Sequence, residues 1–271
     1  MVSNFFQSGN LGGAKVVEIV FLSLVQGVTE WFPISSTGHL VIVQELFKIN
    51  VSIAFDIMLH LGTLIGVILF LRKDLQSILR AVFKLDFSGK EGRILIYLFL
   101  GTIPIGLAGF FLKSFFESMF ENLSATGVAM LLNGLILYST RHAKPGRKMD
   151  ALDSFLIGVS QATAIAPGIS RTGITVSTAL LRGVEKDEAY RFSLLLSIPS
   201  IIGGSLVKLQ DFSFEREHSM IFLGVLVTAF IGYLALGAVR KYIVKQSFHK
   251  FAYYCLAVGT LILLLSIMQT F

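Results

Sequence analysis

Six apolar stretches, each close to the length that crosses a bilayer, restrict this chain to one class of fold. They are expected at residues 51–71, 94–112, 123–139, 189–207, 220–239 and 251–270. Only 15% of the residues are charged, against about 25% in an average soluble domain, and the mean hydropathy is +0.75. We therefore expect an all-α polytopic membrane protein with six transmembrane helices. No Lys or Arg precedes the first apolar run, so a cleaved signal peptide is not expected.

Two further apolar stretches, 15–48 and 155–181, are each interrupted near the middle. The first breaks at Pro33 and the second at Pro167-Gly168, and hydroxyl residues follow both breaks. Each arm is about half the length of a spanning helix, which takes roughly 20 residues. In a membrane such a pair predicts a re-entrant helical hairpin that is buried in protein or faces a watery cavity.

The two hairpins have matching sequences, which suggests an internal repeat. Shifting the sequence by 135 positions lays Ile34-Ser35-Ser36-Thr37-Gly38 on Ile169-Ser170-Arg171-Thr172-Gly173, and Gln26 on Gln161. Each half, 12–139 and 152–271, would then hold one hairpin and three spans. An odd number of crossings makes the halves inverted copies, and the two hairpin tips are expected to meet near the midplane.

Loop charges orient this arrangement. Loops 72–93, 141–150 and 240–250 hold six, four and four Lys or Arg, whereas 113–121 and 208–219 hold one and two. The basic loops are expected on the cytoplasmic side, which places both termini and the opening of the first hairpin outside. Because the net charge of +6 is concentrated in these short loops, no nucleic-acid partner is expected.

The second hairpin carries a lone arginine, Arg171, amid apolar sequence, which is costly in a bilayer and indicates a function. No acid lies nearby in the sequence, so Arg171 is expected to grip a diphosphate, with a structural ion pair to Glu30 as the alternative. A half-helix starting at Thr172 would aim its amide groups at the phosphate, next to the break at Gly168. Ser170 and Thr175 would donate to phosphate oxygens, or instead cap the helix and bond to its carbonyls.

The first hairpin carries the acid. Gln26 and Glu30 are four residues apart and share one helix face, either as a site for Mg²⁺ or Ca²⁺ bridging to a phosphate or as an exposed polar stripe. Of Ser35, Ser36 and Thr37, one is expected to be a nucleophile, although each could simply cap the helix that follows.

Two histidines accompany these residues. His39 could act as base to the nucleophile or as acid to the leaving group. His60 is expected to be a hydrogen-bonded core residue that Asp56 orients.

These motifs resemble those of the undecaprenyl-diphosphate phosphatase family, also called the bacitracin-resistance protein family. The resemblance rests on Gln26-Gly27-Val28-Thr29-Glu30, on Pro33-Ile34-Ser35-Ser36-Thr37-Gly38-His39 and on Pro167-Gly168-Ile169-Ser170-Arg171-Thr172-Gly173-Ile174-Thr175, and it extends over essentially the whole chain. Two positions depart from the family pattern. Thr172 replaces the usual serine but keeps a hydroxyl, and Gln26 takes the uncharged option, which weakens it as a metal ligand.

The resemblance implies a bacterial plasma-membrane enzyme that hydrolyses undecaprenyl diphosphate and so recycles the lipid carrier for peptidoglycan synthesis. It implies a catalytic core of Glu30, Ser36, His39 and Arg171, a divalent cation near Glu30, and Gln26, Ser170 and Thr175 in the substrate site. Whether a serine or water attacks stays open. The alternative is a transporter of an anionic lipid, because inverted repeats with broken helices are typical of transporters. The sequence sets no oligomeric state, and a homodimer is compatible with it.

Overall fold

The computed structural model describes residues 11–49, 51, 53–120, 122–208, 218–245 and 248–269. Its α-helices are α1 (Leu11–Thr29), α2 (Ser36–Phe47), α3 (Ile53–Phe70), α4 (Arg72–Phe83), α5 (Lys90–Phe111), α6 (Lys113–Phe120), α7 (Leu123–Ser139), α8 (Ala151–Ala162), α9 (Arg171–Leu181), α10 (Lys186–Lys208), α11 (His218–Lys245) and α12 (Phe251–Gln269). Short 3-10 turns extend α7 (η1, Thr140–His142) and α8 (η2, Thr163–Ile165) and precede α12 (η4, Phe248–Lys250). The ends of the chain and most of the 208–219 connection, on which part of the expected orientation depends, lie outside the described residues.

Five of the described helices are long and apolar enough to cross a membrane: α5, α7 with η1, α10, α11, and α12 with η4. A sixth span results if α3 and α4 count as one, although the chain bends by 77° between them. The expectation of an all-α polytopic membrane protein is therefore confirmed.

The basic segment 72–93, expected to be a loop, instead begins with the helix α4. Its apolar residues recur at helical spacing, so that Ile78 is buried and Leu75 packs against the core, while Arg72 and Lys73 stay exposed. Such a strongly amphipathic helix is typical of the membrane interface, which explains why the chain turns sharply after α3. The connection 113–121 likewise contains a short helix, α6.

Both expected hairpins form helix pairs, but their first arms start earlier than expected. α1 runs for 19 residues because no proline interrupts the chain before Pro33. α8 begins at Ala151, where Asp150 caps it: the Asp150 carboxylate accepts from the Asp153 amide at 2.8 Å, and the Asp153 carboxylate accepts from the Asp150 amide at 3.0 Å. α8 with η2 stays below spanning length, as a hairpin arm requires.

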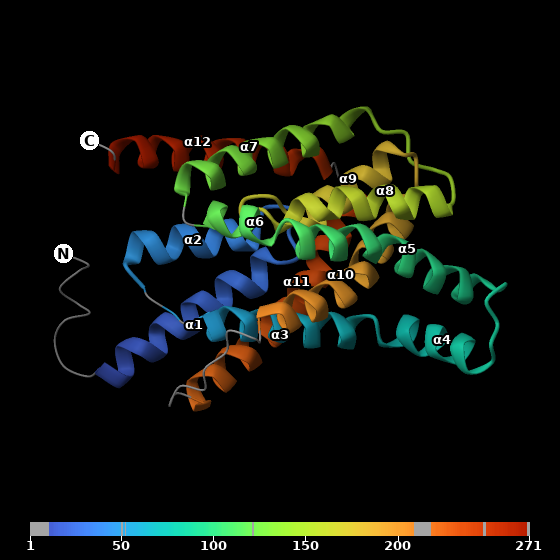
Figure 1. Ribbon diagram of the computed structural model, residues 1–271, viewed down its shortest axis with the longest axis horizontal. Helices are drawn as coiled ribbons and strands as arrows, with labels where there is room; N and C mark the ends of the chain where they lie inside the picture. The colour runs from blue at the N-terminus through green and yellow to red at the C-terminus, as the bar shows by residue number, and fades with distance from the viewer. Residues whose placement is uncertain are drawn as a thin grey trace.

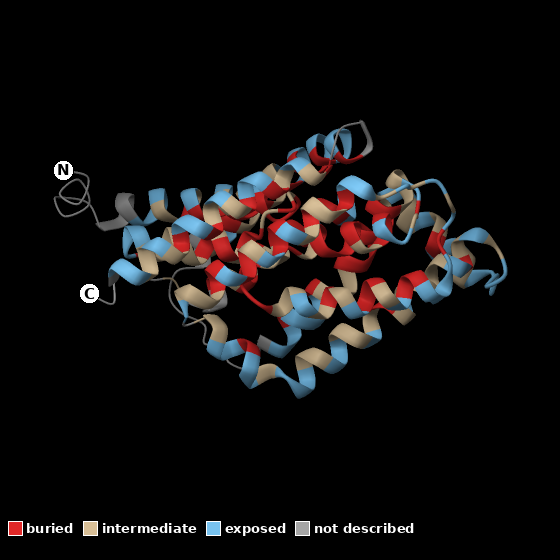
Figure 2. Ribbon diagram, turned by 90° about the horizontal axis from the view of Figure 1, so that it is seen from above, coloured by how far each residue is buried: buried red, intermediate tan, exposed pale blue. Residues whose placement is uncertain are grey.

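The helices pack in pairs around a buried centre. α7 lies along α12, α11 packs against α3 and α1, and α5 packs against α8 (Figure 1). The last contact is close because both helices present glycine: a Cβ on Gly158 would lie 2.3 Å from the carbonyl oxygen of Gly101. Buried residues concentrate in the middle of the bundle, while the outer helix faces are exposed (Figure 2). The pairs α1–α11 and α8–α5 correspond under the 135-residue shift, but the division into inverted repeats, 12–139 and 152–271, stays a prediction.

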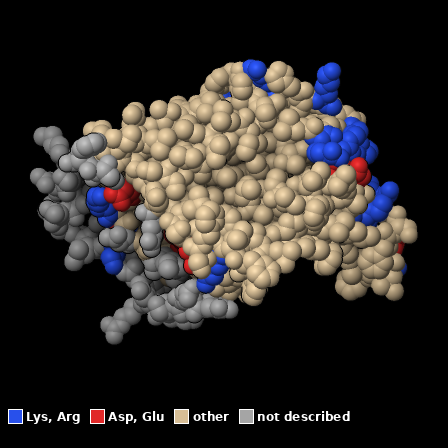
Figure 3. Space-filling model, turned by 45° about the horizontal axis from the view of Figure 1, so that its top comes forward, with Lys and Arg blue, Asp and Glu red and all other residues tan. Residues whose placement is uncertain are grey.

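Charge is distributed unevenly over the surface. On the face in Figure 3, Lys and Arg gather mainly toward the upper right-hand end, and a broad uncharged area lies across the middle. An apolar belt bounded by a basic end is what a membrane-embedded bundle requires.

At the entrance to α8, Asp153 is fully buried between two guanidinium groups. Arg147 Nη1 and Nη2 each donate to it at 2.6 Å, and Arg182 Nε donates at 2.8 Å. Burial alone would raise the pKa of Asp153, but hydrogen bonds from Arg147, from the Asp150 backbone and from Arg182 lower it to about 2. The ionised carboxylate therefore fixes the start of the second hairpin.

Asp153→Asn should lower the free energy of unfolding by about 1–3 kcal/mol at neutral pH, because it removes charge-assisted hydrogen bonds from a buried site. Since the folded pKa is about 2 and the ordinary value is 3.8, this stabilisation is present above about pH 4 and is lost as the pH falls toward 2. Thermal melting in detergent between about pH 4 and pH 2 should show that the difference in Tm between the wild type and Asp153→Asn becomes smaller as the pH falls. Glu117→Gln, which alters an exposed pair with Lys113, is the control. A difference that stays constant as the pH falls would contradict this account.

Candidate active site

The tips of the two hairpins touch at the centre of the bundle. Ser35 Oγ accepts one hydrogen bond from the Gly38 amide and another from the Gly168 amide, both at 3.2 Å. Ser35 has a φ of 67°, and Gly168 has a φ of 100°, a conformation that favours glycine. A Cβ on Gly168 would lie 2.4 Å from the Thr126 carbonyl oxygen of α7. Glycine is therefore required for this tip to pack against α7.

Asn133 of α7 holds the two tips together. Its Nδ2 donates to the Pro33 carbonyl at 3.1 Å, and its Oδ1 accepts from the Ser170 amide at 3.1 Å. The side chain is fully buried. Asn133 was not predicted as a site residue from the sequence, although a lone amide within an apolar span is a signal of a functional or packing role.

At the joined tips, Glu30 forms the centre of a polar cluster. Its Oε1 accepts from Arg171 Nη2 at 2.5 Å, and its Oε2 accepts from Ser36 Oγ at 2.5 Å and from Gln26 Nε2 at 3.0 Å. Only 7% of the Glu30 side chain is exposed. The structure thus brings together four of the residues singled out from the sequence: Gln26, Glu30, Ser36 and Arg171.

Arg171 is packed against protein on several sides, with 14% of its side chain exposed. Besides Glu30, it donates from Nη1 to the Ser197 carbonyl at 3.2 Å, and its Cζ lies 5.7 Å from the centre of the Trp31 ring. The ion pair with Glu30, which the sequence left as the alternative to a phosphate contact, is present in the structure. A buried guanidinium needs such a partner, and the pair is also where a phosphate would compete for the arginine.

Two helices begin at this cluster. α2 starts at Ser36 and α9 starts at Arg171, and both side chains contact Glu30, so the N-terminal, positive dipole ends of the two helices lie beside this carboxylate. Converging helix N-termini beside an arginine form a site for an anion such as phosphate.

Most of the remaining hydroxyls at the tips have structural partners. Ser170 Oγ caps α9 by accepting from the Gly173 amide at 3.1 Å, and Thr175 Oγ1 bonds to the Arg171 carbonyl at 2.8 Å and to Ser193 Oγ at 2.6 Å. Thr172 Oγ1 lies 3.4 Å from the Glu30 carbonyl. Thr37 is partly buried in the first turn of α2. Ser35, Ser170 and Thr175 therefore make the capping or back-bonding contacts, while their role toward a phosphate stays a prediction. Ser36 is the serine whose hydroxyl donates to Glu30.

The two histidines make different contacts, and the catalytic role expected for His39 stays a prediction. Both ring nitrogens of His39 are engaged away from Glu30, at 2.6 Å from the Ser35 carbonyl and 2.7 Å from the Tyr254 hydroxyl. His60 Nδ1 lies 2.9 Å from the Asp56 carbonyl, and its Nε2 lies 3.9 Å from Glu30 Oε2. The histidine expected to be a core residue therefore borders the cluster, because α3 passes beside the first tip. No spacing rule in the sequence connects His60 to Glu30.

The polar cluster offers few ligands for a metal by itself. Within the described ranges, no group of three His, Cys, Asp or Glu is arranged to hold an ion. Glu30 is the acid of the cluster, and Gln26 Oε1 is buried without a hydrogen-bond partner. Mg²⁺ commonly binds through one carboxylate together with substrate phosphates. The Glu30 carboxylate and Gln26 Oε1 therefore fit a cation that arrives with a diphosphate.

Fold and site together define a polytopic membrane protein in which an arginine, a carboxylate and a hydroxyl meet at the tips of two helical hairpins. The chain belongs to the bacitracin resistance protein BacA family, whose family model matches residues 19–261. A protein of Halothermothrix orenii named undecaprenyl-diphosphatase is 37% identical over 262 residues, covering 93% of this chain and 98% of the relative. A Korarchaeum cryptofilum protein of the same name is 36% identical, covering 92% and 98%. Undecaprenyl-diphosphatase 4 of Bacillus cereus is also 36% identical, covering 94% and 99%.

Proposed function

We propose that this protein is a membrane phosphatase that hydrolyses undecaprenyl diphosphate to undecaprenyl phosphate and inorganic phosphate. The observation that carries the proposal is the hydrogen bond of 2.5 Å from Ser36 Oγ to Glu30 Oε2, beside Arg171. A hydroxyl that donates to a buried carboxylate is the arrangement of a nucleophile with its base. In the cell the reaction would recycle the lipid carrier for peptidoglycan synthesis and confer resistance to bacitracin.

Substrate binding would begin at the anion site. The terminal phosphate takes the place of Glu30 at one nitrogen of Arg171, and the amide groups at the start of α2 and α9 donate to its oxygens. Trp31 and the carbonyl of Ser197 keep the guanidinium in place during this exchange. Catalysis of phosphoryl transfer is mainly positioning and charge stabilisation, which these groups supply.

Ser36 Oγ then attacks the terminal phosphorus. Its proton moves to Glu30 Oε2, the bond from phosphorus to the bridging oxygen breaks, and undecaprenyl phosphate leaves. Water subsequently attacks the phosphorus of the phosphoserine, and the bond from phosphorus to Ser36 Oγ breaks. Inorganic phosphate leaves, and Glu30 returns its proton to Ser36 Oγ and is again ionised. The role of His39 as a base stays a prediction, since its ring nitrogens contact Ser35 and Tyr254.

A divalent cation, Mg²⁺ or Ca²⁺, belongs to this proposal as well. Glu30 and Gln26 Oε1 would hold it together with the diphosphate. When bound, it supplies charge neutralisation at the phosphate oxygens.

We place the protein in the bacterial plasma membrane, with both termini and the opening of the site on the outer side. The distribution of basic loops in the sequence supports this orientation. A homodimer also stays a prediction, which light scattering of the purified protein would test.

Phosphate release from a C55 prenyl diphosphate by the purified protein in detergent, with and without EDTA, tests the proposed reaction. Release that EDTA suppresses would support a cation-dependent phosphatase. The competing function is transport of an anionic lipid, for which Arg171 and the helix N-termini would suffice. A pure carrier releases no phosphate under any cation, and that result would overturn the proposal.

Comparing Ser36→Ala with Ser35→Ala identifies the nucleophile. Ser36→Ala should lower phosphate release by about 10³-fold or more, because it removes the attacking oxygen. Ser35→Ala removes a helix cap and the link to Gly168. It should therefore mainly lower the free energy of unfolding, by about 1 kcal/mol, which is measured as a lower Tm. Rapid-quench detection of a labelled phosphoenzyme adds an independent measurement. Substantial activity in Ser36→Ala would assign the attack to a water molecule.

A further inference from the structure

The outer arms of the two hairpins differ in how completely they are covered. Eight residues of α9 are buried, whereas in α2 only Ser36, Gly38 and Leu40 are buried. From Val41 to Phe47 the side chains of α2 are partly or fully exposed. One side of α2 beyond its first turn is thus not covered by protein.

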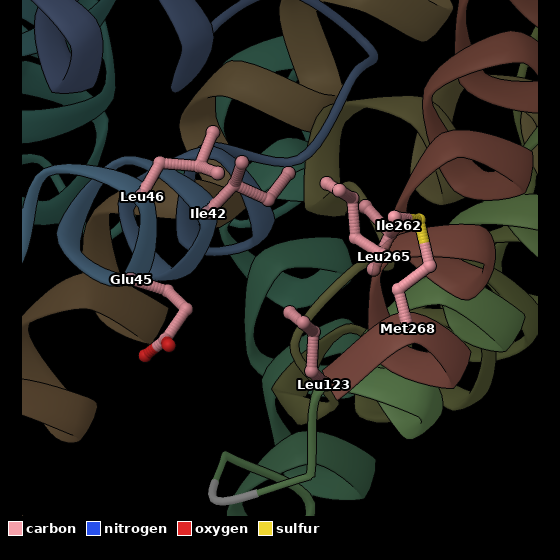
Figure 4. A pocket seen from close by; sticks show the side chains of 7 residues that line it. All are labelled: Ile42, Glu45, Leu46, Leu123, Ile262, Leu265 and Met268. Carbon is pink, nitrogen blue, oxygen red and sulfur yellow. The ribbon is translucent and has the colours of Figure 1, made fainter. Parts of the chain in front are cut away.

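Along this side, α2 and α12 are separated by a groove of about 240 Å³ (Figure 4). Its apolar lining is Ile42 and Leu46 from α2, Leu123 from α7, and Ile262, Leu265 and Met268 from α12. Glu45 also borders it, but Figure 4 shows its carboxylate directed away from the α12 side chains. That carboxylate is paired with Lys48 Nζ at 2.6 Å. The interior of the groove therefore offers apolar contacts to an occupant.

The groove leads to the polar cluster along a single helix. Ser36 is the first residue of α2, and Ile42 and Leu46 follow six and ten residues later, about 9 and 15 Å along the helix axis. Between them, the His39 ring stacks on Tyr254 of α12 with centroids 5.7 Å apart, and the two side chains share a hydrogen bond of 2.7 Å. This contact joins α2 to α12 at the inner end of the groove, where the polar site ends and the apolar lining begins.

We propose that this groove, termed the α2–α12 groove, binds the prenyl chain of the substrate while the diphosphate lies at Ser36 and Arg171. The inference rests on the proposed phosphatase function. A lipid whose headgroup is held at the start of α2 has its chain directed along α2, and the branched apolar chain matches the lining. The His39–Tyr254 contact joins α2 to α12 between Ser36 and the groove, so these two residues position the two helices that line it.

The test compares a C55 prenyl diphosphate with a water-soluble short-chain prenyl diphosphate as substrates. Leu265→Trp fills the groove from α12, away from the catalytic residues, and Ile42→Trp fills it from α2. Leu264→Trp is the matched control, because Leu264 is the exposed neighbour on α12 and lies outside the lining.

For Leu265→Trp we expect kcat/KM on the C55 substrate to fall by about tenfold or more, mainly through KM, because buried apolar contacts with the chain are lost. Release from the short-chain substrate should persist, which also shows that the variant is folded. The control should match the wild type on both substrates.

The remaining outcomes separate the two proposals. In one outcome the wild type releases phosphate, and both Leu265→Trp and Ile42→Trp keep the wild-type preference for the C55 substrate over the short-chain substrate. The prenyl chain then does not occupy the groove, and the inference is wrong. If Leu265→Trp instead changes the oligomeric state in light scattering and leaves that preference intact, the groove is an interface between copies, which also overturns it. Absence of phosphate release by the wild type from either substrate contradicts the proposed function itself.

Discussion

Glu30→Gln should lower phosphate release from a C55 prenyl diphosphate by about 10²–10⁴-fold, with the protein still folded. Glutamine has the size of glutamate and keeps an oxygen that Ser36 and Gln26 can approach, but it cannot take the serine proton. In the structure this carboxylate contacts Ser36 Oγ and Arg171 Nη2 at 2.5 Å each, so one change removes both the base and the anionic partner of the arginine. The loss should appear in kcat, measured at saturating substrate.

Glu18→Gln is the control for this experiment, since Glu18 lies on α1, about three turns before Glu30, which directly follows that helix. It should leave kcat unchanged. Titrating Mg²⁺ separates two roles of Glu30, because a weakened cation ligand is rescued by a higher concentration whereas a missing base is not. Recovery of full activity at high Mg²⁺ would therefore contradict the assignment of Glu30 as the base.

The features of this fold that depend on residues close together in the sequence could be predicted from the sequence. Hydropathy located the spans, Pro33 and Pro167-Gly168 located the breaks, and the serines after the breaks were recognised as candidate helix caps. Ser35 and Ser170 do cap α2 and α9. The helix α4 was not predicted, because basic residues are typical of cytoplasmic loops. Its apolar residues nevertheless recur at helical spacing.

The contacts that assemble the site join residues far apart in the sequence, and no local pattern specifies them. Arg171 and Glu30 are 141 positions apart, and Asn133 reaches both tips from a third helix. His60 borders Glu30 only because α3 packs beside the first hairpin. The motif identified which residues carry the chemistry, whereas tertiary packing decided that Ser36 contacts Glu30 and that His39 contacts Tyr254.

Arg171→Ala should reduce turnover by about 10³–10⁵-fold, the range associated with removing an arginine that stabilises a transferred phosphoryl group. The same change leaves Glu30 buried without its cation, and breaking such a pair costs about 3–5 kcal/mol. Loss of activity in this variant alone would therefore not separate a catalytic role from a structural one. Arg171→Lys keeps the charge but cannot bond to both Glu30 and the Ser197 carbonyl in the same geometry, so a partial loss is expected.

The double variant Glu30→Gln with Arg171→Met separates the two roles. Neither buried charge remains, so the cost of an unpaired ion disappears, and Tm in detergent should return toward the wild-type value. Phosphate release should stay as low as in Arg171→Ala, because the double variant lacks both the guanidinium that stabilises the phosphoryl group and the carboxylate that takes the serine proton. A folded double variant that regains turnover would show that the ion pair only holds the hairpins together and that the reaction occurs elsewhere in the bundle.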